Sequence, residues 1–431
     1  MPKRENPDRT VGFFRKNLET MPRGKRIESL NRKLRGIVRH AYKHSSAFRN
    51  KMDSAVLKPK DIQTLKQLEK LPITKKTDLV ELQRQTPPFG GFETVPIQAL
   101  RRIYVSPGPI CEPGEENYDE IAWAQAMIAA GFRPGDIAVN TFSYHMVPFA
   151  LHMVDNTLHK IGCVTIPTGV GNTEQQVRIL KDLKVTAFCG TPSFLFNIAE
   201  KAEEMGLDLK RDLHLRVGFV AAEMLPESLR SKLEERFGMT IRQSYGTADI
   251  GCLGYECREK NGMHLPDDKI VEIVDPRTGK QLTAGQAGEI VATTFNKVYP
   301  LIRFGTGDLS LLTQAPCPCG RTSPRLVKIL GRADQMTKVR GLFIHPGQAE
   351  SVASRHPLIA RYQVVVTRRE NRDEITFRIE PNGELSGAEK RREEIEGSIR
   401  DVMKLRGNVE FVPAGTIPEG AKRIDDQRSW D

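Results

Sequence analysis

Residues 215–251 read LRVGFVAAEMLPESLRSKLEERFGMTIRQSYGTADIG, and this stretch shows the order of strands and helices that defines the fold. A strand-like run at 217–223 leads into a charged, helix-like stretch, and a second strand-like run follows at 241–246. A strand, a helix and a strand in succession predict two parallel strands of one sheet joined by a crossover helix.

The same alternation extends upstream to about residue 100. The strand-like runs IAVNTF, CVTIPTG and VTAFCGTPS begin at residues 137, 163 and 185, and HMVPFALHMVDNTLHK and TEQQVRILKDL between them have helical spacing. This pattern predicts an α/β fold in which helices cover both faces of a parallel sheet.

The regions on either side differ in pattern. Residues 1–95 are basic with apolar positions at helical spacing, and beyond residue 266 the runs KIVEIV and GEIVATTF predict a β-rich, antiparallel subdomain. The last hundred residues combine strand-like RYQVVVTRR and ITFRIEP with helix-like AEKRREEIEGSIRDVMKL. We therefore predict a large N-terminal domain (1–330), which begins with the helical segment 1–95, and a small C-terminal α+β domain (331–431).

Composition excludes several classes of protein. The chain has 431 residues and a net charge of +11, but its Lys and Arg are spread out without interleaved aromatics, which argues against a nucleic-acid partner. A charged N-terminus and the lack of a long apolar run argue against secretion and against a membrane partner. Seven cysteines, an odd number, argue against a disulfide framework, so we expect a cytoplasmic protein.

Four loops lie where ligands bind in open parallel sheets, at the carboxyl ends of strands: SPGPICEP (106–113), AAEM (221–224), YGTADIG (245–251) and RFGTGD (303–308). The strings PTGVGNTEQQ, CGTPSFL, AAEMLPESLR, YGTAD, RFGTGD and GRADQMTKVRG also occur in the order seen in phenylacetate-CoA ligases. Over about residues 100–350 the chain thus resembles this branch of the adenylate-forming (acyl-CoA synthetase) superfamily.

The resemblance implies a fold and a reaction. It implies a large N-terminal domain and a small C-terminal domain that rotates about a hinge. A carboxylic acid and ATP would give an acyl-AMP, and CoA would then displace AMP, with Mg²⁺ as a further cofactor. Relatives of this size often pair, so a homodimer is also an expectation.

Nucleotide-binding residues are carried over motif by motif. Asp308 would accept hydrogen bonds from the ribose hydroxyls, the stretch 221–223 would line the adenine pocket, and Tyr245 would stack on the base. A buried core tyrosine is the alternative for Tyr245. The full nucleotide set is Ala222, Glu223, Tyr245, Gly246, Thr247, Asp308 and Arg332.

Catalytic and hinge positions follow from the same motifs. Asp249 stands where the family usually has a Glu that binds Mg²⁺, and Lys422 is one residue displaced from the usual catalytic lysine. Asp334 would be the hinge residue. The residues that continue this motif toward the CoA arm are Lys338, Arg340 and Gly341.

The acid would lie among apolar and aromatic side chains. We expect Tyr144, His145, Met146 and Phe149, with the turn Gly169–Thr173 and its Gly171, to line this pocket. Such a lining favours an aryl or otherwise bulky acid. Ordinary helix core is the alternative for each of these residues.

The phosphate loop departs from the family pattern. Ser106 and Gly108 remain, but prolines at 107, 109 and 113 remove amide donors, and Glu112 stands where a Lys is expected. Ala248 also stands where the family commonly has Ser or Thr. Two interpretations stay open. The favoured one is a ligase with a remodelled loop; the other is a protein that binds AMP, acyl-AMP or acyl-CoA without ATP-driven ligation, either as a regulator or as a different acyl-transfer enzyme.

A metal site is the last prediction. Cys257, His264, Cys317 and Cys319 can supply the four ligands of a structural zinc ion, with Cys252 as the reserve. Plain reduced cysteines are the alternative.

Overall fold

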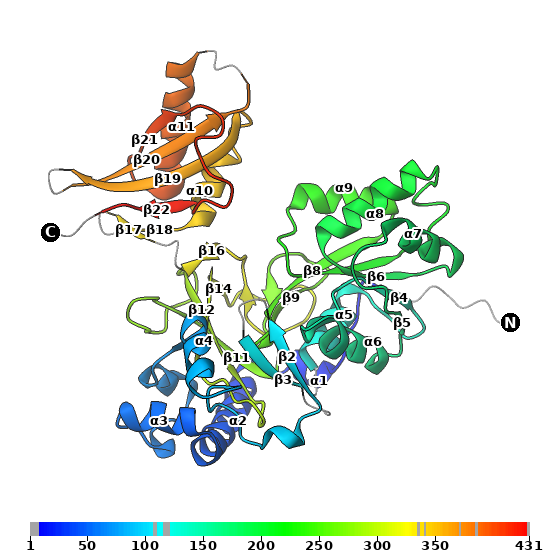
Figure 1. Ribbon diagram of the computed structural model, residues 1–431, viewed down its shortest axis with the longest axis vertical. Helices are drawn as coiled ribbons and strands as arrows, with labels where there is room; N and C mark the ends of the chain where they lie inside the picture. Colours follow the sequence, from blue (N-terminus) through cyan, green and yellow to red (C-terminus); the bar gives the residue numbers. More distant parts are fainter. Residues whose placement is uncertain are drawn as a thin grey trace. The chain divides into compact units, whose positions relative to one another are not determined.

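The computed structural model describes residues 8–106, 110–114, 121–333, 337–339, 342–369, 372–383 and 387–428. The chain divides into two compact units (Figure 1). The first comprises Met1–Gln286, Ile290–Thr306 and Leu311–Val327. The second comprises Lys328–Asp431 together with Ala287–Glu289 and Gly307–Ser310, two short pieces that the sequence pattern did not assign to it.

A nine-stranded sheet of order β14-β15-β10-β9-β8-β7-β6-β4-β5 organises the first unit. Its parallel part is β4 (Ile137–Asn140), β5 (Val164–Ile166), β6 (Ala187–Gly190), β7 (Val217–Val220) and β8 (Thr240–Thr247). The helices associated with it are α5 (Ile121–Ala130), α6 (Asn156–Lys160), α7 (Thr173–Asp182), α8 (Pro192–Glu204) and α9 (Glu227–Phe237). The predicted α/β class is therefore confirmed.

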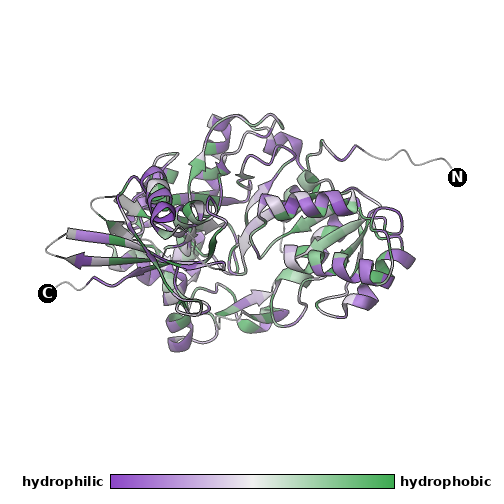
Figure 2. Ribbon diagram, turned by 90° about the horizontal axis from the view of Figure 1, so that it is seen from above, coloured by the Kyte–Doolittle hydropathy of each residue, from purple (hydrophilic) through white to green (hydrophobic). Residues whose placement is uncertain are grey.

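Alternating side chains of the strands enter two separate cores. Val217 and Phe219 of β7 belong to a cluster with Trp123 of α5, whereas Val220 of the same strand packs in a second cluster with Val177 of α7. Successive side chains of a strand point to opposite faces, so this division places apolar layers on both sides of the sheet. Figure 2 shows the strands of this part in green and the helices around them in a mixture of purple and green.

The predicted helix through residues 145–160 is interrupted. Residues Phe149–Asp155 form a π-helix, and the α-helical turn α6 follows directly. Single π-helical segments of this kind are often found near functional sites.

The antiparallel part of the sheet carries the YGTADIG turn. It consists of β9 (Gly251–Glu256), β10 (Met263–His264), β15 (Arg325–Leu326) and β14 (Leu312–Thr313). β8 and β9 pair closely at Gly246, where an added Cβ would lie 2.5 Å from the carbonyl oxygen of Gly251. Only glycine fits this close approach of two backbones.

A second sheet has the order β1-β13-β12-β11, and β16 (Gly331–Arg332) pairs with β13. Its strands are β1 (Thr74–Lys75), β13 (Phe304–Ser310), β12 (Gly288–Thr294) and β11 (Lys269–Val274). The N-terminal helices are α1 (Lys16–Glu19), α2 (Arg23–His44), α3 (Ser46–Ser54) and α4 (Lys76–Gln85). Leu34 and Val38 of α2 and Phe48 of α3 share a core with Ile270 of β11.

The second unit has its own core. A four-stranded sheet of order β21-β20-β19-β22 consists of β19 (Ile359–Arg369), β20 (Arg372–Pro381), β21 (Asn408–Phe411) and β22 (Ile424–Asp426). The remaining elements are the hairpin β17 (Thr337–Val339) and β18 (Leu342–Ile344) and the helices α10 (Pro346–Ala353) and α11 (Ala388–Met403). Val364 and Phe377 of the sheet pack with Ile395 and Ile399 of α11.

Among the helices that the structure describes, none has the length and apolar character needed to cross a bilayer.

Candidate active site and metal centre

The altered phosphate loop forms part of a β-hairpin. β2 (Arg102–Ser106) pairs antiparallel with β3 (Ile110–Gly114), which places Tyr104 opposite Glu112 and Ser106 opposite Ile110. Ser106 is buried, and its hydroxyl donates to the carbonyl of Ile110 at 3.4 Å. Gly108, the other residue predicted to contact phosphate, lies outside the described residues.

Glu112 points into the protein. It is only 4% exposed, and neither carboxylate oxygen has a hydrogen-bond partner among the described residues. Burial and, to a smaller extent, the nearby Asp249 carboxylate raise the pKa of Glu112 to about 8, although Lys76 opposes the shift. A carboxyl group is therefore fixed where the family pattern has a lysine.

Gln83 of α4 holds this strand in place. Its side chain accepts from the backbone N–H of Cys111 at 2.7 Å and donates to the Cys111 carbonyl at 2.8 Å. It also donates to the hydroxyl of Tyr299 at 3.1 Å, and Gln83 itself is buried. Two hydrogen bonds thus fix the backbone next to Glu112, and the third holds Gln83 itself in place.

Asp249 lies in the turn between β8 and β9, and its side chain is fully buried. Lys76, the first residue of α4, donates to Asp249 Oδ2 at 2.7 Å. Asp249 Oδ1 has no partner among the described residues. Sequence reasoning missed Lys76, because a lysine at a helix start is usually solvated and no motif marks it.

Four further nucleotide-binding candidates lie in the first unit. The Tyr245 hydroxyl donates to Thr306 Oγ1 at 3.3 Å, and Tyr245 is only partly buried, which leaves ring surface for stacking.

Exposed Glu223 accepts from Ser193 Oγ at 2.9 Å and from the Ser193 N–H at 3.2 Å. Ala222 before it has a φ of +70°, a strained value for a residue with a Cβ. The Thr247 hydroxyl accepts from the Ile250 N–H at 3.3 Å within the turn.

The second unit brings Asp308 and Arg332 together. These residues face each other across β13 and β16, and the Arg332 guanidinium donates to Asp308 Oδ1 at 3.0 Å. An added Cβ on Gly307 would lie 2.6 Å from Arg332 Nη2, so the guanidinium lies against a residue without a side chain. The same region therefore holds a carboxylate and a cation, the two groups that a ribose phosphate requires.

Other predicted residues of the second unit are less informative. Lys422 is exposed, and its backbone carbonyl accepts from Gln363 Nε2 at 3.1 Å. Lys338 lies in β17. Asp334, Arg340 and Gly341 lie outside the described residues.

Aromatic residues predicted to line the acid pocket pack against a core cluster of the first unit. Phe149 packs at right angles against Phe142 with ring centroids 4.5 Å apart and against Trp123 at 5.1 Å. Tyr144 is half-buried, and its hydroxyl accepts from Asn140 Nδ2 at 2.9 Å. His145 and Met146 next to it are exposed.

The turn opposite Tyr144 is held by a residue that sequence reasoning missed. An added Cβ on Gly169 would lie 3.8 Å from the Tyr144 ring, so this glycine lies next to Tyr144. Gln176 of α7 donates to the carbonyl of Gly169 at 2.9 Å and to that of Gly171 at 2.8 Å. Gln176 is almost fully buried, so its amide is held in place and stabilises the turn.

Cys257, His264, Cys317 and Cys319 come together at one point, with all four ligand atoms within 4.8 Å of one another. Cys257 Sγ lies 3.7 Å from Cys317 Sγ, and Cys319 Sγ lies 3.4 Å from His264 Nε2. A tetrahedral zinc with Zn–S bonds of about 2.3 Å needs S···S edges of about 3.8 Å, and the Cys257–Cys317 distance matches this value. Cys252, the reserve ligand, lies apart, with its thiol 3.7 Å from the Gly254 carbonyl.

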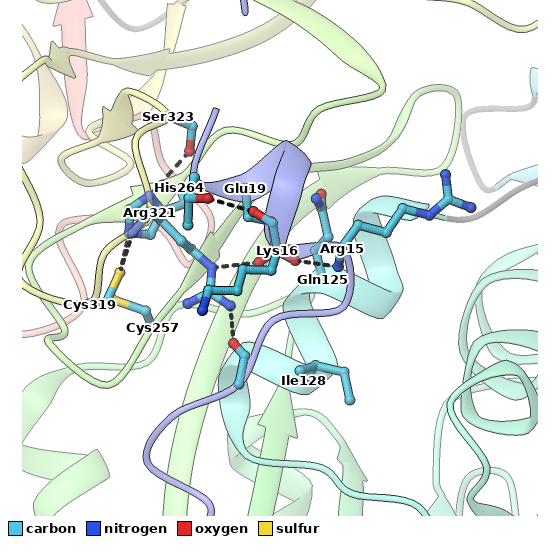
Figure 3. Close-up of polar contacts among 12 residues, drawn as sticks. Arg15, Lys16, Glu19, Gln125, Ile128, Cys257, His264, Cys319, Arg321 and Ser323 are labelled. Atoms are coloured by element: carbon cyan, nitrogen blue, oxygen red, sulfur yellow. Dashed lines mark hydrogen bonds and ion pairs between the residues drawn. The ribbon is translucent and has the colours of Figure 1, made fainter. Parts of the chain in front are cut away.

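The surroundings favour a thiolate. Hydrogen bonds from Cys257 and His264 lower the pKa of Cys319, and the Arg321 N–H donates to its sulfur at 3.4 Å. His264 Nδ1 lies 3.2 Å from Ser323 Oγ, which orients the ring so that Nε2 faces the sulfurs (Figure 3). A metal ligand of this kind usually has such a second partner.

Arg321 connects this cluster to the N-terminal segment. Its guanidinium donates to Glu19 Oε2 at 2.8 Å (Figure 3). It also donates to the Gly12 carbonyl and lies 4.7 Å from the centre of the Phe13 ring. Glu19 is fully buried, so this ion pair lies inside the first unit. The four-ligand cluster thus adjoins the attachment of α1.

Comparison with known proteins identifies the family of the chain. The family model for the AMP-binding enzyme matches residues 121–296, and that for the AMP-binding enzyme C-terminal domain matches residues 341–428. A 2-hydroxyisobutyryl-CoA ligase, solved in an open conformation with 2-HIB-AMP and CoA, superposes with a TM-score of 0.87. It is 27% identical, and the match covers 98% of this chain and 95% of that one.

Curated relatives extend over nearly the whole chain. The phenylacetate-coenzyme A ligase of Thermus thermophilus is 32% identical over 95% of this chain and 98% of its own length. The phenylacetate-coenzyme A ligase of Escherichia coli is 31% identical over 92% and 94%. The chain therefore belongs to the AMP-binding enzyme family, in its phenylacetate-CoA ligase-like branch.

Proposed function

We propose that this enzyme is an ATP-dependent acid–CoA ligase that works through an acyl-adenylate, and that its acid is aryl or otherwise bulky. The observation that carries the proposal is the similarity to phenylacetate-coenzyme A ligases along almost the full length of the chain. The aromatic cluster of Phe149, Phe142 and Tyr144 supports the choice of acid, because flat aromatic side chains pack well against an aryl group.

Two half-reactions make up the chemistry. The carboxylate of the acid attacks the α-phosphorus of ATP, and pyrophosphate leaves. The sulfur of CoA then attacks the acyl carbonyl, a thioester forms, and AMP leaves with the electrons of the broken C–O bond. Asp308 and Arg332 would hold the ribose and phosphate of the nucleotide, and Tyr245 would stack on the base.

The remaining assignments follow the same scheme. Asp249 would bind the Mg²⁺ that accompanies ATP, since a buried carboxylate suits a hard cation. Lys422 would act in adenylation, and Asp334, with Lys338, Arg340 and Gly341, would serve the hinge and the CoA arm. These roles, a C-terminal domain from residue 331 that rotates as a whole, a homodimer and a cytoplasmic setting remain predictions.

We assign a structural zinc ion to the cluster of Cys257, His264, Cys317 and Cys319. Three sulfurs and one imidazole in a closed set suit zinc, and no ligand position is left for a substrate. Such an ion would stabilise the region next to the Arg321–Glu19 ion pair rather than take part in the reaction.

The direct test measures pyrophosphate release and CoA-thioester formation with a panel of aryl acids, with acetate and 2-hydroxyisobutyrate for comparison. We expect both products to depend on ATP, CoA and an aryl acid, and the Asp308→Ala variant to lose them. Binding of AMP or acyl-CoA without ATP turnover for any acid would instead favour the other interpretation of the altered loop.

A further inference from the structure

A small cavity in the first unit is lined by residues whose carboxylate or hydroxyl oxygens have no hydrogen-bond partner among the described residues. Its volume is about 40 Å³, and Glu112, Asp249 and Thr294 are among the residues that line it. Both oxygens of Glu112, Oδ1 of Asp249 and Oγ1 of Thr294 are buried without a hydrogen bond among the described residues. Carboxylate and hydroxyl oxygens are the donors that a hard cation prefers.

Lys76 compensates Asp249, because its ammonium is paired with Asp249 Oδ2. No second cation is available for Glu112 among its described neighbours, and its raised pKa means that it is mostly protonated at neutral pH. A bound cation would supply the positive charge that lets Glu112 ionise in this buried place. The cavity has room for a cation with one or two waters, because a single water needs only about 10–15 Å³.

The donors are already in position before any ligand arrives. Gln83 fixes the backbone at Cys111, and the β8–β9 turn and the Lys76 ion pair fix Asp249. Thr294 lies in β12, where its N–H donates to the Leu301 carbonyl at 3.0 Å. Ligands held on strands and helices lose little freedom when they bind a metal.

We infer that Glu112, Asp249 and Thr294 bind a divalent cation, Mg²⁺ or Mn²⁺, in the absence of nucleotide. This inference rests on the proposed ligase function. A carboxylate and a divalent cation together carry one positive charge, the same as the lysine that Glu112 replaces. The cation thus restores positive charge at the altered phosphate loop, and ATP meets a metal that the protein already holds.

The test is titration of the full-length, zinc-loaded chain with Mn²⁺ alone, followed by electron paramagnetic resonance of the free ion. We expect one Mn²⁺ site in the wild-type chain and at least tenfold weaker binding in Glu112→Gln and in Thr294→Val. The matched control is Glu81→Gln, since Glu81 is an exposed carboxylate on α4, and it should bind Mn²⁺ like the wild type. Circular dichroism of each variant verifies that it is folded.

Thioester formation by the same samples separates this inference from the proposed function. Wild-type turnover without nucleotide-free Mn²⁺ binding would overturn the cation site and leave the ligase intact. Equal Mn²⁺ binding by the wild type and Glu112→Gln would overturn it as well. Mn²⁺ binding that Glu112→Gln weakens, in a chain that makes no thioester with any acid, would support the site and contradict the ligase.

Discussion

The Lys76 ammonium lies 2.7 Å from Asp249 Oδ2 and joins the first residue of α4 to the turn between β8 and β9. The Asp249 side chain is fully buried, whereas Lys76 is partly exposed. The helical N-terminal segment therefore supplies a cation to the predicted metal and phosphate site.

Replacing Lys76 with Met should weaken ATP binding, because the variant leaves Asp249 buried beside Glu112 with no positive charge. We expect the KM for ATP to rise at least tenfold. The free energy of unfolding should fall by about 1–3 kcal/mol, less than for a fully buried pair because Lys76 is partly exposed. Lys75→Met, at the exposed neighbouring position, should behave like the wild type. An unchanged KM for ATP in the Lys76 variant would contradict the role of this ion pair.

Zinc should be present in the purified protein at about one ion per chain, measurable by inductively coupled plasma mass spectrometry. Cys319→Ser should lose the ion and lower the unfolding temperature, because metal binding contributes to folding stability. Cys252→Ala should keep its zinc, since Cys252 lies outside the cluster. A zinc content that falls with Cys252 but not with Cys319 would show that the ligand set is wrong.

Arg230 and Glu256 form a buried ion pair with two hydrogen bonds, at 2.7 and 2.8 Å, between α9 and β9. Arg230→Met should lower the free energy of unfolding by about 3–5 kcal/mol in urea denaturation, because it leaves Glu256 charged and buried. Arg211→Met removes an exposed pair with Asp212 and should cost less than about 1 kcal/mol. Similar losses of the free energy of unfolding in the two variants would contradict the conclusion that a buried ion pair costs more to break than an exposed one.

Lys51 should make stability depend on pH above neutrality. Burial lowers the pKa of Lys51 to about 7, with Arg303 adding to the shift and Glu272 opposing it. Between pH 7 and about 10.4 the unfolded chain binds this proton and the folded chain does not, so stability rises with pH over this window. Relative to Lys51→Met, the wild type should gain on the order of 2 kcal/mol from pH 7 to pH 10. Parallel pH profiles of unfolding for the two proteins would exclude this effect.

Replacing Gln176 should weaken binding of the acid and leave binding of the nucleotide unchanged. Gln176→Ala removes the hydrogen bonds to the carbonyls of Gly169 and Gly171, so the turn beside Tyr144 becomes free to move. We expect the KM for the acid to rise about tenfold, equivalent to about 1.4 kcal/mol, with the KM for ATP unchanged. Arg178→Ala, at an exposed site on the same helix, is the control. A rise in the KM for ATP instead would show that this turn is not part of the acid pocket.

The sequence by itself determined the fold class and the family. Apolar runs of two distinct periods, as in 215–251, are local properties that predict strands and helices, and ordered motifs such as YGTAD and RFGTGD identified the phenylacetate-CoA ligase-like branch. Gly246 was predicted from its motif as a nucleotide-binding residue, and only the structure shows that a Cβ there would lie 2.5 Å from the Gly251 carbonyl oxygen. Spacing also drew attention to Cys257, His264, Cys317 and Cys319, and the structure places their ligand atoms together.

Tertiary structure decided which distant side chains meet. Lys76 and Asp249 are 173 positions apart in the chain, and Gln83 reaches Cys111 from another element, so no local pattern could connect either pair. Likewise, the sequence marked Glu112 only as a charge in the wrong place. Only the tertiary structure buries Glu112 at the cavity that Asp249 and Thr294 also line. The electrostatics of a carboxylate depend on what surrounds it in space and not on its neighbours in the chain.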